Sequence, residues 1–99
     1  MKNLNSSQRS YLKAQAHHLE PMIHIGKNGL TDGTIHSISK ALSSKELIKV
    51  KFREYKDDKQ KIAAKIETKT LSHIVGIIGH TLILFKRILE PDKQKYQLP

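Results

Sequence analysis

The fold of this chain is decided by Leu47-Ile48-Lys49-Val50-Lys51-Phe52-Arg53. Apolar and basic residues alternate along this stretch, so Ile48, Val50 and Phe52 point to one side and the basic side chains point to the other. A period of two is typical of a half-buried β-strand. The stretch therefore predicts a strand with one face in a core and a positively charged opposite face.

A helix and a short strand are expected before this stretch. The first helix should run from about Ser6 to His18, because Asn5 and Gln8 form a capping-box pattern at its start. The apolar run from Met22 to Ile25 then predicts the first strand. A loop of two glycines separated by Lys27-Asn28 follows that strand directly.

A second helix is expected between that loop and Leu47. Thr31 or Asp32 can cap it, and Ile35, Ile38 and Leu42 share one helical face.

A third helix and two strands are expected after Arg53. Asp57-Asp58 should open the helix as cap and first-turn acids. Leu71 to Ile78 and Thr81 to Phe85 are rich in β-branched and apolar residues, and Gly79-His80 between them predicts a hairpin turn. Since the segment from Leu82 to Phe85 is apolar at every position, we expect a strand buried on both faces, away from the sheet edge.

These segments predict an α/β fold in the order αβαβαββ. The strands that alternate with helices favour parallel pairing, and the final hairpin adds an antiparallel pair. The sequence thus predicts a single domain over residues 1–99, with a mixed four-stranded sheet packed with helices. Its core should span about 6–87, and the polar C-terminal tail 88–99 should be loosely ordered.

The composition of the 99 residues restricts the possible functions. Eighteen Lys and Arg against nine Asp and Glu give a net charge of +9, which attracts a polyanion such as nucleic acid, an acidic protein or an anionic membrane surface. The polar N-terminus resembles no signal peptide, and no run approaches the ~20 apolar residues of a membrane span. A cytoplasmic location without membrane attachment is the default expectation.

Catalytic, metal and cofactor sites have little support in the sequence. The absence of cysteine removes disulfides, thiolate nucleophiles and thiolate zinc sites together. The six histidines show no metal-ligand spacing, and the nine acids are scattered along the chain. We therefore expect no catalytic residue, no metal and no cofactor.

The loop Gly26-Lys27-Asn28-Gly29 is the first candidate binding site. It lies between a predicted strand and a predicted helix start, where glycines let the backbone approach a ligand and free N–H groups favour an anion. Lys27 adds a positive charge, and a GxxG loop clamps nucleotide backbone in KH domains by similar physics. An ordinary glycine-rich turn remains the alternative, because GxxG alone is a weak signal.

Two lysine patterns are further candidates. Lys49 and Lys51 lie with Arg53 on the outer face of the predicted strand, and a same-sign ladder of Lys61, Lys65 and Lys69 recurs every four residues on the predicted third helix. Like charges at that spacing destabilise an isolated helix by about 0.2–0.5 kcal/mol per pair, which favours an anionic partner. Solvated outer faces remain the alternative for both patterns. Since stacking aromatics are few, contact with phosphate and RNA shape is favoured over base stacking.

Four motifs in order resemble the CRM domain, the YhbY-type RNA-binding family, over about Ser6 to Lys86. The motifs are Leu12…Ala16-His17-His18-Leu19-Glu20-Pro21, Ile25-Gly26-Lys27-Asn28-Gly29-Leu30-Thr31, Glu46-Leu47-Ile48-Lys49-Val50-Lys51 and Ile78-Gly79-His80-Thr81-Leu82-Ile83-Leu84. The resemblance implies a fold similar to the C-terminal domain of translation initiation factor three. Bacterial members are associated with precursors of the large ribosomal subunit, and plant organellar relatives carry the domain in group II intron splicing factors.

The resemblance also implies binding residues and a partner. The family's GxxG loop maps onto Gly26, Lys27, Asn28 and Gly29, and its basic strand maps onto Lys49 and Lys51. The family usually ends its last strand with Tyr-Arg, where this chain has Phe85-Lys86, so Lys86 keeps the charge without the bidentate guanidinium. The expected function is binding of ribosomal RNA during large-subunit assembly. A basic domain that docks on an acidic protein is the alternative, and the oligomeric state stays open.

Overall fold

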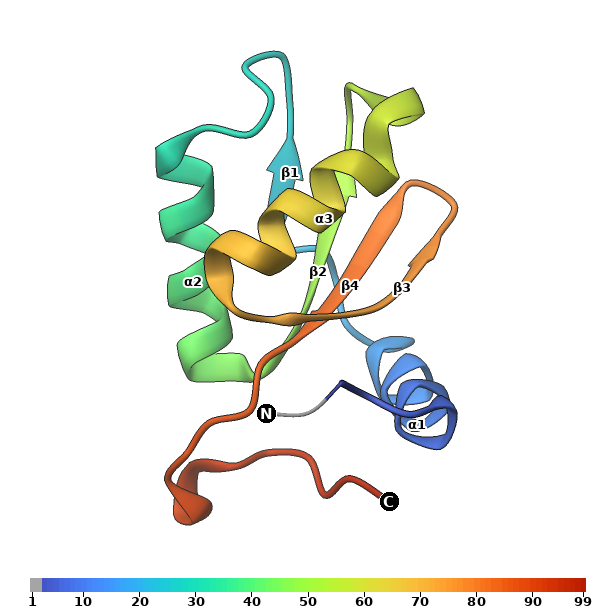
Figure 1. Cartoon of the computed structure of the whole chain (residues 1–99), viewed down its shortest axis with the longest axis vertical. Helices are drawn as coiled ribbons and strands as arrows, with labels where there is room; N and C mark the ends of the chain where they lie inside the picture. The colour runs from blue at the N-terminus through green and yellow to red at the C-terminus, as the bar shows by residue number, and fades with distance from the viewer. Residues whose placement is uncertain (1–2) are drawn as a thin grey trace.

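Four strands form one mixed sheet in the computed structural model, which describes residues 3–99 (Figure 1). The strands are β1 Ile23–Ile25, β2 Leu47–Phe52, β3 His73–Ile78 and β4 Thr81–Phe85, in the spatial order β1-β2-β4-β3. Strand β1 runs parallel to β2, and β4 is antiparallel to both of its neighbours. The predicted αβαβαββ order and mixed sheet are confirmed. Met1 and Lys2 of the predicted domain lie outside the described residues.

The position of β4 follows from its sequence. Four consecutive side chains from Leu82 to Phe85 are buried, which requires a partner layer on both faces and a neighbouring strand on both edges. As a result β4 lies between β2 and β3, which point the same way but do not pair. The expected parallel pairing therefore holds only for β1 with β2.

Three helices cover the sheet. They are α1 Ser6–Ala16, α2 Asp32–Lys45 and α3 Lys59–Thr70, and two short 3₁₀ turns, η1 Lys56–Asp58 and η2 Pro91–Lys93, complete the elements. Asn5 and Gln8 form the predicted capping box at α1, since the Asn5 side chain accepts from the Gln8 N–H at 2.8 Å and Gln8 accepts in return at 3.0 Å. Thr31 caps α2 by accepting from the Thr34 N–H.

The start of α3 differs from the prediction. Asp58 occupies the N-cap position, but its side chain makes no capping hydrogen bond, because the η1 turn precedes the helix and shapes the entry. Asp58 is thus the N-cap residue, as expected, but it makes no side-chain capping bond, and the expected first-turn acids are wrong because the first turn of α3 contains none. Within α3 Glu67 binds a backbone instead of a lysine, accepting from the Ile74 N–H at 2.7 Å, and so ties the helix to β3.

Two apolar clusters lie on opposite faces of the sheet because alternate side chains of a strand point to opposite sides. The face packed with α2 and α3, which we call the two-helix face, carries Ile48, Val50 and Phe52 of β2, as predicted. The other face, which we call the α1 face, packs Leu12 and Ala16 of α1 on the sheet. In Figure 1, helix α3 crosses in front of the sheet, and α1 lies at the lower right of the view.

The two ends of the sheet differ in what surrounds them. At the loop end lie the Gly26–Gly29 loop, the connection 53–58 and the Gly79-His80 turn, brought together because Lys51 pairs with Thr81 and the Phe52 N–H donates to the His80 carbonyl. At the tail end lie Glu46, Lys86 and the residues 87–99 (Figure 1).

The C-terminal tail is not loosely ordered as expected. Tyr96 and Leu98 pack on the α1-face cluster, and the Lys95 N–H donates to the carboxylate of Glu46 at 2.6 Å. Glu46 is fully buried and also accepts from the Ile88 N–H at 2.7 Å. The sequence did not reveal this anchor, because its partners lie more than 40 residues away.

Candidate nucleic-acid interface

The Gly26–Gly29 loop is a tight turn at the end of β1. The Gly29 N–H donates to the Gly26 carbonyl at 2.9 Å, and Gly29 adopts φ +66°, a conformation that favours glycine. A Cβ placed on Gly26 would meet nothing within 4 Å, so this residue leaves bare backbone open to a ligand. Lys27 and Asn28 between the glycines are exposed.

Tyr55 supports this loop from the connection after β2. Its hydroxyl donates to the Lys27 carbonyl at 2.8 Å, and its ring lies 3.4 Å from the point where a Gly29 Cβ would stand. Tyr55 itself has φ +57°, an uncommon conformation for an aromatic residue. The sequence alone does not show this contact, because nothing in it places Tyr55 beside a loop 28 residues earlier.

Two lysines of α3 face the loop. Lys65 and Lys69 line a hollow of about 480 Å³ together with Asn28, Gly29 and Tyr55. The side chains of Lys27, Lys65 and Lys69 make no hydrogen bond or ion pair within residues 3–99, so all three charges remain open to a ligand. The structure therefore brings two of the three lysines of the ladder to the loop. Lys61 lies one turn earlier on α3, exposed but outside this hollow.

The N-terminus of α2 contributes less to this site than the sequence indicated. The helix begins at Asp32, three residues after the loop, and the Thr31 hydroxyl already accepts from the Thr34 N–H. The acidic side chain of Asp32 in the first turn also interacts favourably with the helix dipole. The attraction of an anion to this end of the molecule therefore comes mainly from lysine charges.

Lys49 and Lys51 lie on the other side of the sheet from this hollow. Both side chains point to the α1 face, opposite Ile48, Val50 and Phe52. The Lys49 ammonium donates to the Leu19 carbonyl at 2.9 Å, so it also holds the chain between α1 and β1. Lys51 is half-buried and makes no side-chain hydrogen bond within the described part of the chain.

Lys86 is separated from the other candidates. It follows β4 at the tail end, where its ammonium donates to the Thr70 carbonyl at 3.0 Å at the C-terminus of α3. A lysine at this position satisfies a carbonyl that the helix leaves without a partner and interacts well with the helix dipole. The structure thus gives Lys86 an internal contact and does not bring it to the loop.

The loop end holds basic groups that the sequence did not single out. Lys59 donates to the Gly79 carbonyl and lies 3.2 Å from Nδ1 of His80. Desolvation and the positive charges of Lys59, Lys56 and Lys51 lower the pKa of His80 below its ordinary value. Three lysines therefore lie near enough to the hairpin turn for their charges to act on His80. Residue spacing alone gave no sign of it, because the hairpin and η1 meet only in the folded chain.

Metal and membrane features can be stated for the described residues. Among residues 3–99, no three histidine or carboxylate side chains come together in a way that could hold a metal ion. In the same range no helix has the length and apolar character needed to cross a membrane.

The fold and the glycine-bounded loop after β1 define the chain as a small α/β domain with a single sheet. Comparison with known sequences then identifies its family. The CRS1/YhbY (CRM) domain matches residues 4–86, and the chain belongs to this family. The family is not enzymatic, and neither is this chain. The resemblance drawn from the four sequence motifs is thereby confirmed.

Individual relatives extend the match over the whole chain. An "RNA-binding protein" of Haemophilus influenzae is 40% identical and covers 100% of this chain and 98% of its own length. "Probable RNA-binding protein YqeI" of Bacillus subtilis is 35% identical over 97% of this chain and 99% of its own. The solution structure of SAV1595 from Staphylococcus aureus, described as a candidate RNA-binding protein, is 32% identical with a TM-score of 0.81, covering 97% and 99% of the two chains.

Proposed function

We propose that this protein binds RNA through the loop end of its sheet. Relatives that match nearly the whole chain are named RNA-binding proteins, and the net charge of +9 suits a polyanionic partner. The single observation that carries the proposal is the hollow in which Gly29, Lys65 and Lys69 lie together. Bare backbone at Gly26 and the free ammonium of Lys27 add to the same surface.

The chemistry of this surface favours phosphate contacts over base reading. Lysine ammonium groups act as point charges on phosphates, whereas base edges are read by planar or bidentate groups. The aromatic residue at the site, Tyr55, has its hydroxyl bound to the Lys27 carbonyl and one region of its ring against Gly29. The domain therefore recognises a folded RNA mainly by its backbone and shape. Lys61, Lys49 and Lys51 extend the contact, while Lys86 contributes least because of its internal hydrogen bond.

The RNA that we propose is ribosomal RNA in precursors of the large ribosomal subunit, bound in the cytoplasm during assembly. The support is the family resemblance, whose stand-alone bacterial members are associated with such precursors. The domain would act without a catalytic group, metal or cofactor, as a binding factor that holds an RNA segment.

Crosslinking in living cells, followed by sequencing of the attached RNA, tests this function. We expect one sharp peak on precursor ribosomal RNA of the large subunit, reduced when Lys27 is replaced by alanine and retained when Lys93 at the tail end is replaced. Signal spread over all abundant RNA would remove the ribosomal target. Partners that remain attached after ribonuclease treatment would instead support docking on an acidic protein.

A further inference from the structure

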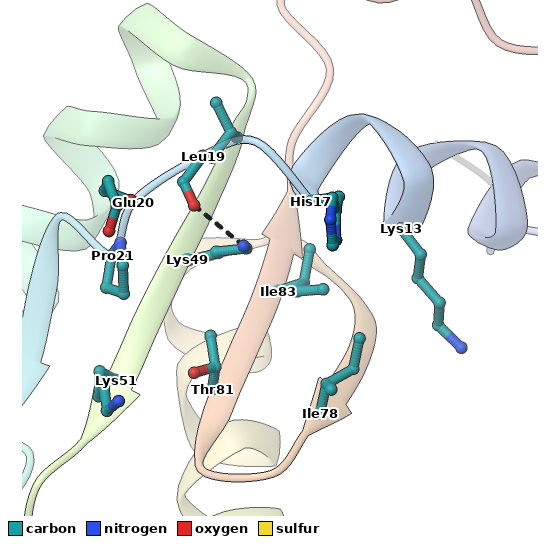
Figure 2. A pocket seen from close by; sticks show the side chains of 10 residues that line it. All are labelled: Lys13, His17, Leu19, Glu20, Pro21, Lys49, Lys51, Ile78, Thr81 and Ile83. Atoms are coloured by element: carbon teal, nitrogen blue, oxygen red, sulfur yellow. Dashed lines mark hydrogen bonds between the residues drawn. The ribbon is translucent and has the colours of Figure 1, made fainter.

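The α1 face of the sheet contains a second basic hollow, of which the proposed function uses only Lys49 and Lys51. It measures about 350 Å³, within the range of ligand clefts, and lies between the C-terminal part of α1 and the strands β2, β3 and β4 (Figure 2). We call it the sheet hollow. Its walls include Lys13 of α1, His17 directly after α1, Lys49 and Lys51 of β2, and Thr81 of β4.

Charge makes the sheet hollow suitable for an anion. Three lysines line it against one carboxylate, that of Glu20. Neither Lys13 nor Lys51 makes a side-chain hydrogen bond or ion pair within the described residues, whereas Lys49 is held by the Leu19 carbonyl. Lys49 thus fixes the wall, and the other two lysines can meet a phosphate. The Thr81 hydroxyl and the His17 ring add further hydrogen-bonding groups.

A β-bulge positions Lys13 over the sheet. The register between β3 and β4 shifts between Ile74 and Gly76, so that Val75 is the extra residue and Gly76 stands opposite Ile83 on the α1 face. A Cβ on Gly76 would lie 2.7 Å from the Lys13 Cε. Because Gly76 has no side chain, the Lys13 side chain can lie directly over this position of β3. This close approach explains a glycine in the interior of a strand, where glycine is otherwise unfavourable.

The sheet hollow and the Gly26–Gly29 loop lie on the two sides of one sheet edge. Lys51 pairs in register with His24 on β1, and the loop begins two residues after His24. Neighbouring strands are about 4.8 Å apart, so a nucleic-acid strand that crosses this edge passes from Lys51 to the loop over a short path. Arg53 lies along that path and donates to the His24 ring at 3.1 Å.

We propose that the sheet hollow is a second site for RNA phosphodiester backbone, so that one RNA is held on both faces of the sheet across the β1 edge. This inference rests on the proposed RNA binding and adds Lys13 of α1 and the adjoining His17 to the interface. An RNA that folds around an edge needs an unpaired or bent segment there, because an unbroken duplex is too stiff to follow both faces.

Binding of a labelled RNA hairpin with single-stranded flanks, measured over a series of salt concentrations, tests the second site. We expect Lys13→Ala and Lys51→Ala each to weaken binding about three- to fivefold and to lower the salt slope by about one, while Lys93→Ala at the tail end changes neither. Gly76→Ala should weaken binding to a similar degree without any change of charge, because its Cβ displaces Lys13.

A double variant shows whether Gly76 acts through Lys13. If it does, Gly76→Ala adds no further loss in the Lys13→Ala background. If the two losses add, the positioning of Lys13 by Gly76 is overturned. If all three variants bind like Lys93→Ala while Lys27→Ala is weakened, the second site is refuted and the loop-end function stands. If the wild-type protein binds no RNA, the proposed function and the second site both fall.

Site-specific crosslinking gives an independent readout, since the chain contains no cysteine. A photoreactive group can be attached at Asn28→Cys in the loop, at Ile78→Cys on the rim of the sheet hollow, and at Ser43→Cys near the tail end as a control. Ile78 is 59% exposed, so the label should not disturb the core. We expect the loop and rim probes to crosslink different nucleotides of the same RNA. Crosslinking by the rim probe no stronger than by the Ser43→Cys control would overturn the two-face arrangement.

Discussion

The loop end and the tail end of the same sheet use charged residues in opposite ways. At the tail end the buried carboxylate of Glu46 accepts hydrogen bonds from the Ile88 and Lys95 N–H groups, and Lys86 and Arg87 donate to the Thr70 and Tyr96 carbonyls. At the loop end the side chains of Lys27, Lys65 and Lys69 have no such partner within residues 3–99. The charged side chains named at the tail end stabilise the fold, whereas these three lysines of the loop end remain open to a ligand.

This difference separates a structural lysine from a binding lysine more reliably than sequence position does. Lys86 and Lys27 both follow an apolar strand, yet the ammonium of Lys86 is already bound. A bound ammonium must give up a hydrogen bond before it meets a phosphate, so it contributes less to affinity.

Glu46→Ala should produce the largest loss of stability, at the tail end. Removal of a fully buried carboxylate leaves the Ile88 and Lys95 N–H groups and the Arg87 guanidinium without their partner. We expect the free energy of unfolding to fall by about 3 kcal/mol, measured by chemical denaturation. Protease should then cut the tail 88–99 early.

The exposed Glu90 provides the control for this prediction. Glu90→Ala should change the free energy of unfolding by less than about 0.5 kcal/mol. A Glu46→Ala protein as stable as Glu90→Ala, with a protected tail, would mean that Glu46 does not anchor the tail.

Gly29→Ala should lower the stability of the protein because of the backbone conformation that the loop requires at this position. Because Gly29 has φ +66°, an alanine there is strained by about 1–2 kcal/mol. Gly26 has no such conformation and open space around it, so Gly26→Ala should change stability by less than about 0.5 kcal/mol. Equal stabilities of the two variants in thermal unfolding would contradict the turn described for the loop.

Tyr55→Phe should loosen the loop without moving charge. The variant loses the hydrogen bond to the Lys27 carbonyl, which at this exposed site contributes about 0.5–1 kcal/mol. We expect a comparable loss of stability and about a twofold weaker affinity for RNA, both measured beside wild type. An unchanged affinity would mean that the loop needs no support from Tyr55 to bind.

The pH dependence of His80 should give the smallest effect. Its lowered pKa means that it gains a proton more readily when unfolded, so its contribution to stability decreases as pH falls below about 6.5. Bound phosphate favours the imidazolium, so RNA should raise the pKa of His80 in an NMR titration. The same pKa with and without RNA would place the hairpin outside the interface.

The sequence predicts the sheet well because local patterns determine its elements. Alternation in β2, the fully apolar β4 and the Asn5 capping box each depend on neighbours within a few residues, and each is confirmed. The tail was predicted wrongly because its ordering depends on Glu46, up to 50 residues earlier. A polar composition indicates a loose tail only when no buried group binds its backbone.

The candidate site was predicted only in part for the same physical reason. Spacing identified the Gly26–Gly29 loop and the lysine ladder, and the fold brings Lys65 and Lys69 to the loop. Spacing could not show that Lys49 and Lys51 lie on the other face from this hollow, nor that Tyr55 supports the loop. These facts depend on how the strands and the connections pack, which one sequence does not display.

The salt dependence of RNA binding by two charge-matched triple variants distinguishes a binding surface at the loop end from attraction by net charge alone. One variant replaces Lys27, Lys65 and Lys69 by alanine at the loop end, and the other replaces Lys45, Lys93 and Lys95 near the tail end. We expect the loop-end variant to lower the salt slope by about two to three, and the tail-end variant to keep a slope close to that of wild type. Equal slopes for the two variants would show that RNA responds only to net charge, and would contradict a binding surface at the loop end.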